Sequence, residues 1–134
     1  PSQAEGTAVM VARRAGVIAG LPLAIAAFEL LAANTECRAL VHDGAHVAES
    51  TPVLELSGSA RALLSAERVA LNFAQRLSGV ATLTARYVSA VRGTRAKILD
   101  TRKTTPGFRA PEKYPGRCGG GTNPRADLAA PGLT

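Results

Sequence analysis

The sequence contains few aromatic residues and no tryptophan: aromatic side chains make up 4% of its 134 residues, although 46% are hydrophobic. A core is therefore expected, but alanine, leucine and valine must fill most of it. Long apolar runs are also missing, since stretches such as Leu21–Phe28 fall well short of the roughly 18–20 residues of a membrane helix. Residues 1–5 lack the basic region and apolar run of a secretory signal. The sequence predicts a globular domain with no membrane span and no membrane partner.

Cysteine is also scarce: the sequence contains two, Cys37 and Cys118. They have neither the CxxC spacing of a zinc site nor the density of a disulfide scaffold, so we expect free thiols in a reducing cytoplasm. His42 and His46 are separated by the turn signal Asp43-Gly44, which excludes the helical geometry of a metal-binding histidine pair. No metal site in the chain, and no Ser/His/Asp or Cys/His arrangement, is expected.

The formal net charge of +6 is distributed unevenly along the chain. Residues 1–91 contain seven basic and seven acidic side chains, so the entire excess lies in residues 92–134. This basic segment attracts anions. It contains two aromatic residues, Phe108 and Tyr114, whereas nucleic-acid-binding surfaces usually combine basic with several aromatic side chains. The pattern favours a small polyanionic ligand and ranks nucleic acid last.

Short patterns of β-branched and alternating residues predict five strands in the first part of the chain. They cover residues 7–12, 16–19, 37–41, 46–47 and 53–57. Between the second and third of them, Pro22 is placed to open a helix that ends near Asn34. This helix is expected to bury the apolar side chains at helical spacing, which are Ala24, Ile25, Phe28, Leu31 and Ala32.

Residues 61–92 form a longer helical pattern in which Ser78-Gly79 predicts a break, so two packed helices are expected. The expected buried faces contain Leu63, Ala70, Leu71, Ala74 and Leu77 in the first helix and Val80, Leu83, Tyr87 and Val91 in the second. Ser65 is a candidate N-cap. On local pattern alone, Arg68 is typical of a surface arginine paired with an acidic neighbour.

The basic segment has the order of one β/α unit: Gly93 to end the preceding helix, a strand over residues 94–99, a polar loop, and a helix from near Pro111. Ligands bind at the C-terminal ends of strands in such units, so Arg102 and Lys103 are candidates to hold a carboxylate and a phosphate. A solvated basic loop is the alternative. The glycines at 119–121 indicate either a loop that approaches a phosphate or a plain linker.

The most extended pattern consists of three successive segments: Ser65–Thr82, Ala96–Arg109 and Glu112–Asn123. The middle segment includes Asp-Thr-Arg-Lys-Thr-Thr-Pro-Gly-Phe-Arg, and the last contains Arg-Cys-Gly-Gly-Gly-Thr-Asn. Together they resemble the quinolinate phosphoribosyltransferase family, and the similarity runs over residues 1–123.

The resemblance implies an α/β fold: an α+β sandwich domain with linking helices over residues 1–91, followed by the first β/α unit of an α/β barrel over residues 92–134. It implies phosphoribosyl transfer from phosphoribosyl pyrophosphate to quinolinate with decarboxylation, which gives nicotinate mononucleotide, pyrophosphate and CO₂ in NAD biosynthesis. Mg²⁺ accompanies the pyrophosphate. Arg102, Lys103 and Arg125 match substrate-binding positions, with Lys103 also catalytic, and Arg68 matches an arginine donated across a homodimer interface.

The sequence departs from the family pattern towards its end. Pro124 stands where the family has histidine, and Pro115-Gly116 stands where it has Ala-Val, a change expected to weaken the helix there. Eight β/α units occupy about 250 residues, so residues 92–134 hold about one. In the family the carboxylates that contact the ribose lie on later strands. We therefore expect a fragment with a truncated barrel, impaired activity and marginal stability.

A non-catalytic interaction module is the alternative from another functional class. Residues 42–47 and 52–54 resemble the turn and strands of biotinyl and lipoyl domains. Those domains attach their cofactor to a lysine, and residues 1–96 contain none. Covalent carrier chemistry is therefore excluded for that part of the chain.

Overall fold

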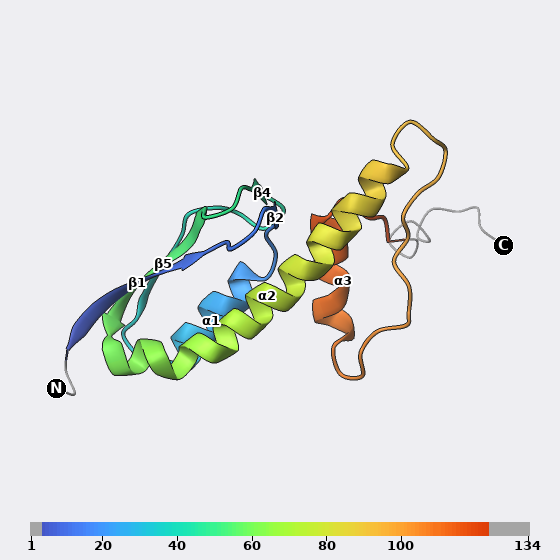
Figure 1. Ribbon diagram of the computed structural model, residues 1–134. Coiled ribbons are helices and arrows are strands. Elements are labelled where there is room, and N and C mark those ends of the chain that lie inside the picture. Colours follow the sequence, from blue (N-terminus) through green and yellow to red (C-terminus); the bar gives the residue numbers. More distant parts are fainter. Residues whose placement is uncertain (1–3, 124–134) are drawn as a thin grey trace.

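The computed structural model describes residues 4–123 and has an α/β fold (Figure 1). A three-stranded antiparallel sheet has the order β1 (Glu5–Val11), β5 (Pro52–Ser59), β3 (Glu36–Ala39). A second, two-stranded sheet pairs β2 (Gly16–Val17) with β4 (His46–Val47). The five predicted strands are thus confirmed: β4 has the predicted bounds, and the other four differ by one or two residues at one or both ends.

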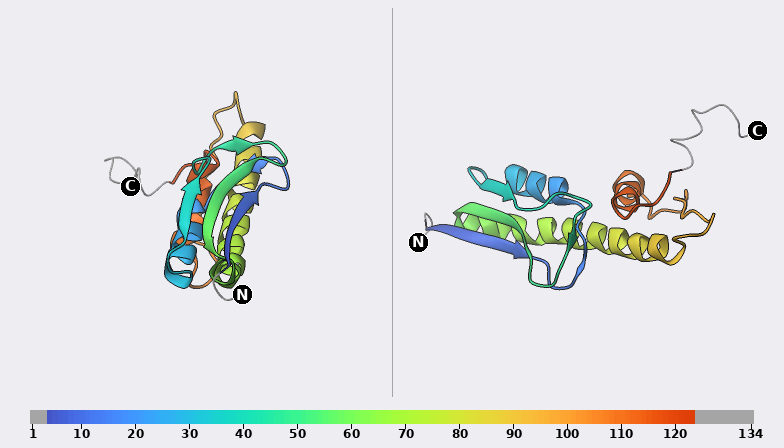
Figure 2. Two further views of the ribbon diagram at one scale, coloured as in Figure 1. Left: turned by 90° about the vertical axis from the view of Figure 1, so that its left-hand side faces the viewer. Right: turned by 90° about the horizontal axis from the view of Figure 1, so that it is seen from above.

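Three helices complete the described part of the chain: α1 (Leu21–Leu31), α2 (Ala60–Ala90) and α3 (Arg109–Cys118). Figure 2 shows the sheets and α1 along one half of α2, and α3 beside the other half. The long helix therefore carries the sandwich on one half and the basic segment on the other. No helix among residues 4–123 is both long and apolar enough to cross a bilayer.

The main core lies between the three-stranded sheet and the two helices on its inner face. Leu54 and Leu56 of β5 point inwards, Phe28 is the bulkiest fully buried side chain, and alanines line the contact between α1 and α2. Small side chains let the two helices approach closely. This is how an alanine-rich, aromatic-poor sequence still forms a packed interior.

Helix α1 begins as predicted, with Pro22 in its first turn. The amides at its N-terminus have no partner inside the helix and are bound by Asp43. Oδ2 of Asp43 accepts from the Gly20 N–H at 2.7 Å, and Oδ1 accepts from the Leu21 N–H at 3.1 Å. The predicted burial of Leu31 is wrong, because this side chain is 52% exposed. The helix ends at Leu31; Ala32 is buried as predicted, and Ala27, which was not predicted, is buried as well.

The predicted break at Ser78-Gly79 is wrong, because α2 runs without interruption for 31 residues. The Ser78 hydroxyl accepts from the Ala19 N–H at 3.0 Å and donates to the Ala19 carbonyl at 3.1 Å. Thr82 binds the N–H of Val17 in the same way at 2.9 Å. The small polar residues inside the helix therefore tie the strand segment 17–19 to it, which propensity alone does not reveal.

Two other details of α2 differ from expectation. Ser59 is the N-cap, accepting from the Ala62 N–H at 3.2 Å, whereas the Ser65 hydroxyl donates to the Arg61 carbonyl at 2.9 Å. Leu71, Leu83 and Tyr87 were expected inside but are exposed, and Ala66 and Ala81 are buried instead. The straight helix presents its alanines to α1 and to the loop beside β2, so the larger side chains fall on the other face.

The mid-helix glycine gives a first prediction. Gly79 has open space around the position of a Cβ and no positive φ, so Gly79→Ala should raise the free energy of unfolding by about 0.5–1 kcal/mol in urea denaturation. Gly20→Ala is the matched control, since Gly20 has a φ of +93° and a Cβ there would lie 2.8 Å from Leu77 Cδ1. It should lower stability, and a loss in Gly79→Ala would contradict a continuous helix.

The strand predicted over residues 94–99 is mostly absent. A single parallel bridge joins Leu99 to Thr122, with the Asp100 N–H donating to the Thr122 carbonyl at 3.0 Å and the Thr122 N–H donating to Ile98 at 2.9 Å. A lone strand needs a neighbour to form a ladder, and Thr122 supplies one pair of bonds. The following helix is confirmed as α3, which continues through Pro115 and Gly116 despite the expected weakening.

Candidate functional site

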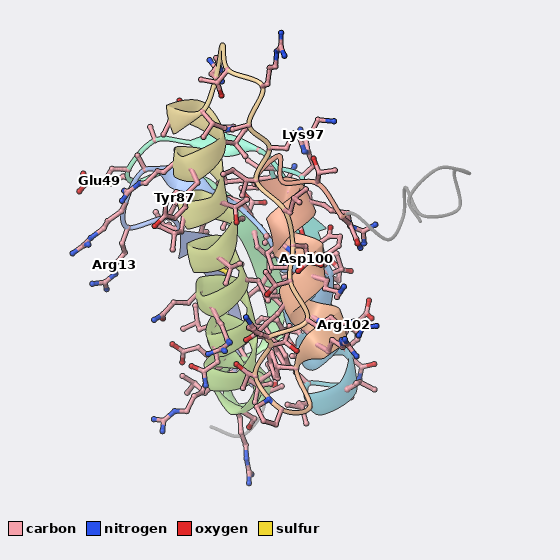
Figure 3. All side chains as sticks on the ribbon, turned by 90° about the vertical axis from the view of Figure 1, so that its right-hand side faces the viewer. Arg13, Glu49, Tyr87, Lys97, Asp100 and Arg102 are labelled. Carbon is pink, nitrogen blue, oxygen red and sulfur yellow. The ribbon has the colours of Figure 1, made fainter. Side chains whose placement is uncertain are left out.

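The two cationic candidates lie on the loop over residues 100–108, between the Leu99 bridge and α3. Arg102 and Lys103 are both exposed. Figure 3 shows the loop running along α3, with Asp100 and Arg102 on the same stretch. Within the loop, the Lys103 N–H donates to Thr101 Oγ1 at 3.3 Å and the Thr104 N–H donates to the Arg102 carbonyl at 3.1 Å. These bonds bend the loop at the two cations.

A small cavity of about 190 Å³ lies beside this loop, between α2, α3 and the Leu99–Thr122 bridge. Asp100, Thr101, Lys113 and Arg117 line part of it, whereas neither Arg102 nor Lys103 does. Lys113 Nζ lies 3.0 Å from Asp100 Oδ2, so one of the two cations in the cavity lining is already paired. The described residues therefore place Arg102 and Lys103 next to this cavity and not inside it.

The end of the loop is held by a polar cluster that we call the Arg76–Glu112 cluster, formed by Arg76, Thr105, Phe108 and Glu112. Glu112 accepts from the Thr105 N–H at 2.9 Å and from the Thr105 hydroxyl at 2.7 Å. Arg76 of α2 pairs with Glu112 and donates to Thr105 Oγ1 at 2.8 Å. The Thr105 hydroxyl, followed by the Arg76 and Thr105 N–H bonds, lowers the pKa of Glu112 to about 2. Glu112 is therefore ionised at neutral pH.

Phe108 completes the cluster with ring contacts. Its ring stacks on Phe73 with centroids 6.0 Å apart, and the Arg76 guanidinium lies 5.3 Å from its centroid. These contacts bring the loop against α2. The sequence did not reveal the cluster, because Arg76 lies 29 residues before Thr105 and 36 before Glu112, and no local pattern indicates that these side chains meet.

The glycine run at 119–121 has neither of its two predicted roles in the structure. All three amides are used at the end of α3: Gly119 donates to Pro115, Gly120 to Arg117 and Gly121 to Gly116, at 3.0, 2.9 and 2.9 Å. A Cβ on Gly119 would lie 2.4 Å from the Ala81 carbonyl oxygen. The glycines allow α3 to pack tightly on α2, so they leave no free amides for a phosphate.

Tyr114 of α3 also contacts the sandwich part of the chain. Burial, followed by a hydrogen bond to the Asp43 carboxylate, raises the pKa of Tyr114. Asp43 is the residue that caps α1, so one side chain links the start of α1 to α3. Burial likewise raises the pKa of the nearby Cys118 thiol, and both cysteines are free. A raised pKa makes Cys118 a poor nucleophile.

The other two candidate residues lie away from the loop or outside the described part. Arg68 is exposed on α2, two turns before Arg76 and therefore about 12 Å from it along the helix axis. Within residues 4–123 Arg68 forms no salt bridge, so the acidic pairing expected from local pattern is absent. Arg125 and Pro124 lie outside the described residues.

Comparison with known proteins identifies the origin of this arrangement. The family model "Quinolinate phosphoribosyl transferase, N-terminal domain" matches residues 1–78, and the model of the C-terminal domain of the same family matches residues 80–133. The chain belongs to the quinolinate phosphoribosyltransferase family. The two family models meet inside α2, at the helix that carries both parts of the structure.

Individual relatives agree with this assignment. The chain is 47% identical over 126 residues to a probable nicotinate-nucleotide pyrophosphorylase (carboxylating) of Synechocystis, covering 94% of this chain and 43% of the relative. It is 46% identical to the Mycobacterium leprae nicotinate-nucleotide pyrophosphorylase (carboxylating), covering 96% and 46%. The crystal structure of NadC from Streptococcus pyogenes superposes with a TM-score of 0.86 at 44% identity, covering 92% and 45%.

The chain thus spans less than half the length of these three relatives. The family models name a phosphoribosyl transferase and the two relatives are named pyrophosphorylases, so the comparisons favour the enzyme family over the carrier-like interaction module. The comparisons also confirm the α/β fold that was predicted from the sequence.

Proposed function

We propose that this chain supplies the substrate-binding loop of a quinolinate phosphoribosyltransferase. The reaction transfers phosphoribose from phosphoribosyl pyrophosphate to quinolinate with loss of CO₂, and it yields nicotinate mononucleotide and pyrophosphate for NAD biosynthesis. Arg102, Lys103 and Arg125 bind substrate, and Lys103 also takes part in catalysis. Family membership supports the reaction, and the chemistry of the loop supports the roles of Arg102 and Lys103.

The observation that carries this proposal is the contrast between paired and unpaired cations around the loop. Arg76 and Lys113 are each paired with a carboxylate. Arg102 and Lys103 form no salt bridge within the described part of the chain and remain exposed. Both substrates are polyanions, so two free neighbouring cations on an anchored loop are suited to bind them.

The two cations differ in what they contribute. The planar guanidinium of Arg102 matches a carboxylate of quinolinate with two parallel hydrogen bonds. The Lys103 ammonium is a compact charge that stabilises negative charge wherever it develops on the reacting groups. Together they hold the acidic substrate and offset the repulsion between the two anions.

Mg²⁺ belongs to this proposal as the companion of phosphoribosyl pyrophosphate. No group of three or more His, Cys, Asp or Glu side chains that could hold a metal occurs within residues 4–123. Of the carboxylates nearest the loop, Asp100 is bound by Lys113 and Glu112 by Arg76 and Thr105. The described residues therefore do not fit a resident ion, and we assign the metal to the pyrophosphate.

We further propose a homodimer in which Arg68 of each chain reaches the partner's site. The exposure of Arg68, its lack of an acidic partner within residues 4–123 and its distance from Arg76 along α2 support this. The two free cysteines are compatible with a cytoplasmic location.

Calorimetric titration with quinolinate tests the binding role. Arg102→Ala should weaken the affinity roughly ten- to hundredfold, because it removes charge-assisted hydrogen bonds worth about 1.5–3 kcal/mol. Arg92→Ala is the matched control, since Arg92 is also an exposed arginine of the basic segment. Equal losses in both variants would mean that net charge alone attracts the ligand, and the assignment of Arg102 would fail.

Turnover gives a separate prediction for the same chain. Negative charge near the ribose is needed as its oxocarbenium-like centre develops, and the two carboxylates beside the loop are neutralised by cations. We therefore expect quinolinate binding without phosphoribosyl transfer when the purified chain is mixed with phosphoribosyl pyrophosphate and Mg²⁺. Chromatographic detection of nicotinate mononucleotide above the no-protein control would contradict this expectation.

A further inference from the structure

The loop with the two cations is anchored immediately before and shortly after them. On the first side, the Asp100 N–H donates to the Thr122 carbonyl at 3.0 Å, and the Asp100 carboxylate pairs with Lys113 at 3.0 Å. On the second side, both the N–H and the hydroxyl of Thr105 donate to Glu112. Lys113 and Glu112 are adjacent residues of α3. One turn of α3 therefore fixes both ends of the segment that contains Arg102 and Lys103.

The second anchor also connects the loop to α2. The Arg76 guanidinium binds Glu112 and Thr105 Oγ1, and it lies over the ring of Phe108. Phe108 in turn stacks on Phe73, three residues before Arg76 on α2. The end of the loop is thus held by charge, hydrogen bonds and an aromatic contact, all to residues on two packed helices.

Arg76 has a second consequence for the electrostatics of the loop. An unpaired Glu112 carboxylate would add a free negative charge beside Thr105, on the loop that carries Arg102 and Lys103. The Arg76 charge and the Thr105 bonds occupy both oxygens of Glu112. Lys113 forms an ion pair with Oδ2 of Asp100. The acidic residues that shape the loop are neutralised locally, and the two loop cations stay free.

We propose that Glu112 and Arg76 are positioning residues: by binding Thr105, they hold Arg102 and Lys103 in a fixed loop open to an anionic substrate. The effect on substrate affinity rests on the proposed function, whereas the effect on the conformation of the loop does not. A loop ordered before binding loses less conformational entropy when the ligand arrives. The cluster therefore affects affinity without touching the ligand.

Limited trypsin digestion measures the loop directly, because trypsin cleaves after Arg102 and Lys103. In Glu112→Gln and Thr105→Val, cleavage at these two sites should be roughly tenfold faster than in the unaltered chain, since charge-assisted bonds that close the loop are lost. Cleavage at Arg38 and Arg61 in the sandwich should not change. Thr105→Ser keeps the hydroxyl and should restore the slow rate. Glu55→Gln, which breaks the exposed Arg38–Glu55 pair, is the matched control and should leave the loop rate unchanged.

Two results would overturn the proposal. One is an unchanged rate at Arg102 and Lys103 in Glu112→Gln. The other is faster cleavage at every site, which would show general unfolding. Titration of the same variants with quinolinate separates this proposal from the proposed function. A chain that binds no quinolinate but shows selective loop cleavage in Glu112→Gln refutes the function and supports the positioning role. Unchanged quinolinate affinity in a variant with a loosened loop refutes the positioning of substrate-binding residues.

Discussion

Phe28→Ala is expected to lower the free energy of unfolding by about 3–5 kcal/mol, the usual range for removing a buried phenylalanine. Phe28 is 2% exposed and sits in the core formed by the sheet, α1 and α2. The core contains no tryptophan and consists largely of alanine, leucine and valine. No neighbouring large ring can fill the cavity, so urea denaturation followed by circular dichroism should show the full loss.

Leu30→Ala is the matched control for Phe28→Ala. Leu30 lies two residues further along the same helix and is 83% exposed, so its removal should change stability by less than about 0.5 kcal/mol. If Phe28→Ala and Leu30→Ala had similar effects, α1 would not pack on the sheet through the face described above. A helix turned by about 100°, the rotation between successive residues, would produce that result.

Gly119→Ala is expected to have the second largest effect, lowering the stability of the α2–α3 contact by about 3 kcal/mol. A Cβ at this position would lie 2.4 Å from the Ala81 carbonyl oxygen, 2.7 Å from Thr84 Cβ and 3.0 Å from the Ala85 nitrogen. These are backbone and near-backbone atoms of α2, which has no hinge at which to move aside. The clash must push α3 away from α2. Amide hydrogen exchange should show faster exchange in α3 while the β5 amides stay protected.

Gly116→Ala is the control for the Gly119 prediction. Gly116 lies in the same helix, but a Cβ there would meet nothing within 4 Å. Alanine should be neutral or stabilise the helix by up to about 1 kcal/mol. If Gly119→Ala were as harmless as Gly116→Ala, the glycine run would be a spacer and α3 would not pack tightly on α2.

The Gly119 variant also bears on function. Because α3 carries Glu112 and Lys113, displacement of this helix should release both ends of the loop with Arg102 and Lys103. We therefore expect Gly119→Ala to weaken quinolinate binding as well as stability. The expected effect arises through the packing of α3 on α2.

Local sequence patterns correctly predicted the elements that their own residues favour, which are the strands β1 to β5 and the start of α1. The strand positions followed from β-branched runs, and the start of α1 followed from Pro22. The β/α pattern placed the loop with Arg102 and Lys103 between a strand and a helix; the helix is present, whereas the strand is reduced to a single bridge. Whether these residues and Arg68 and Arg125 act on substrate stays a prediction.

The errors share a physical cause, which is contact between distant parts of the chain. Ser78 and Gly79 indicated a break, but Ser78 binds Ala19, 59 residues away, and the helix continues. The strand at 94–99 had a suitable sequence, yet a strand forms through a neighbour, and Thr122 pairs with it at one position. Propensity describes each segment alone and cannot show such partners.

The Arg76–Glu112 cluster and the glycine run illustrate the same limit for the site. Glu112 counted in the sequence as one acidic residue among many, and its importance comes from Thr105 and Arg76 meeting it in space. The glycines at 119–121 were predicted to form a ligand loop or a linker, but in the structure their amides bind carbonyls at the end of α3. The conformation of this loop depends on how α2 and α3 pack, and local sequence patterns do not show that packing.

The most direct test of the account is a titration of the ¹⁵N-labelled chain with quinolinate, followed by amide chemical shifts. We expect the largest shift changes at residues 101–105, much smaller changes in β1, β3 and β5, and loss of the changes in Arg102→Ala. Changes spread evenly over all exposed basic residues, or no changes at saturating quinolinate, would contradict the claim that this loop is the binding element for the acidic substrate.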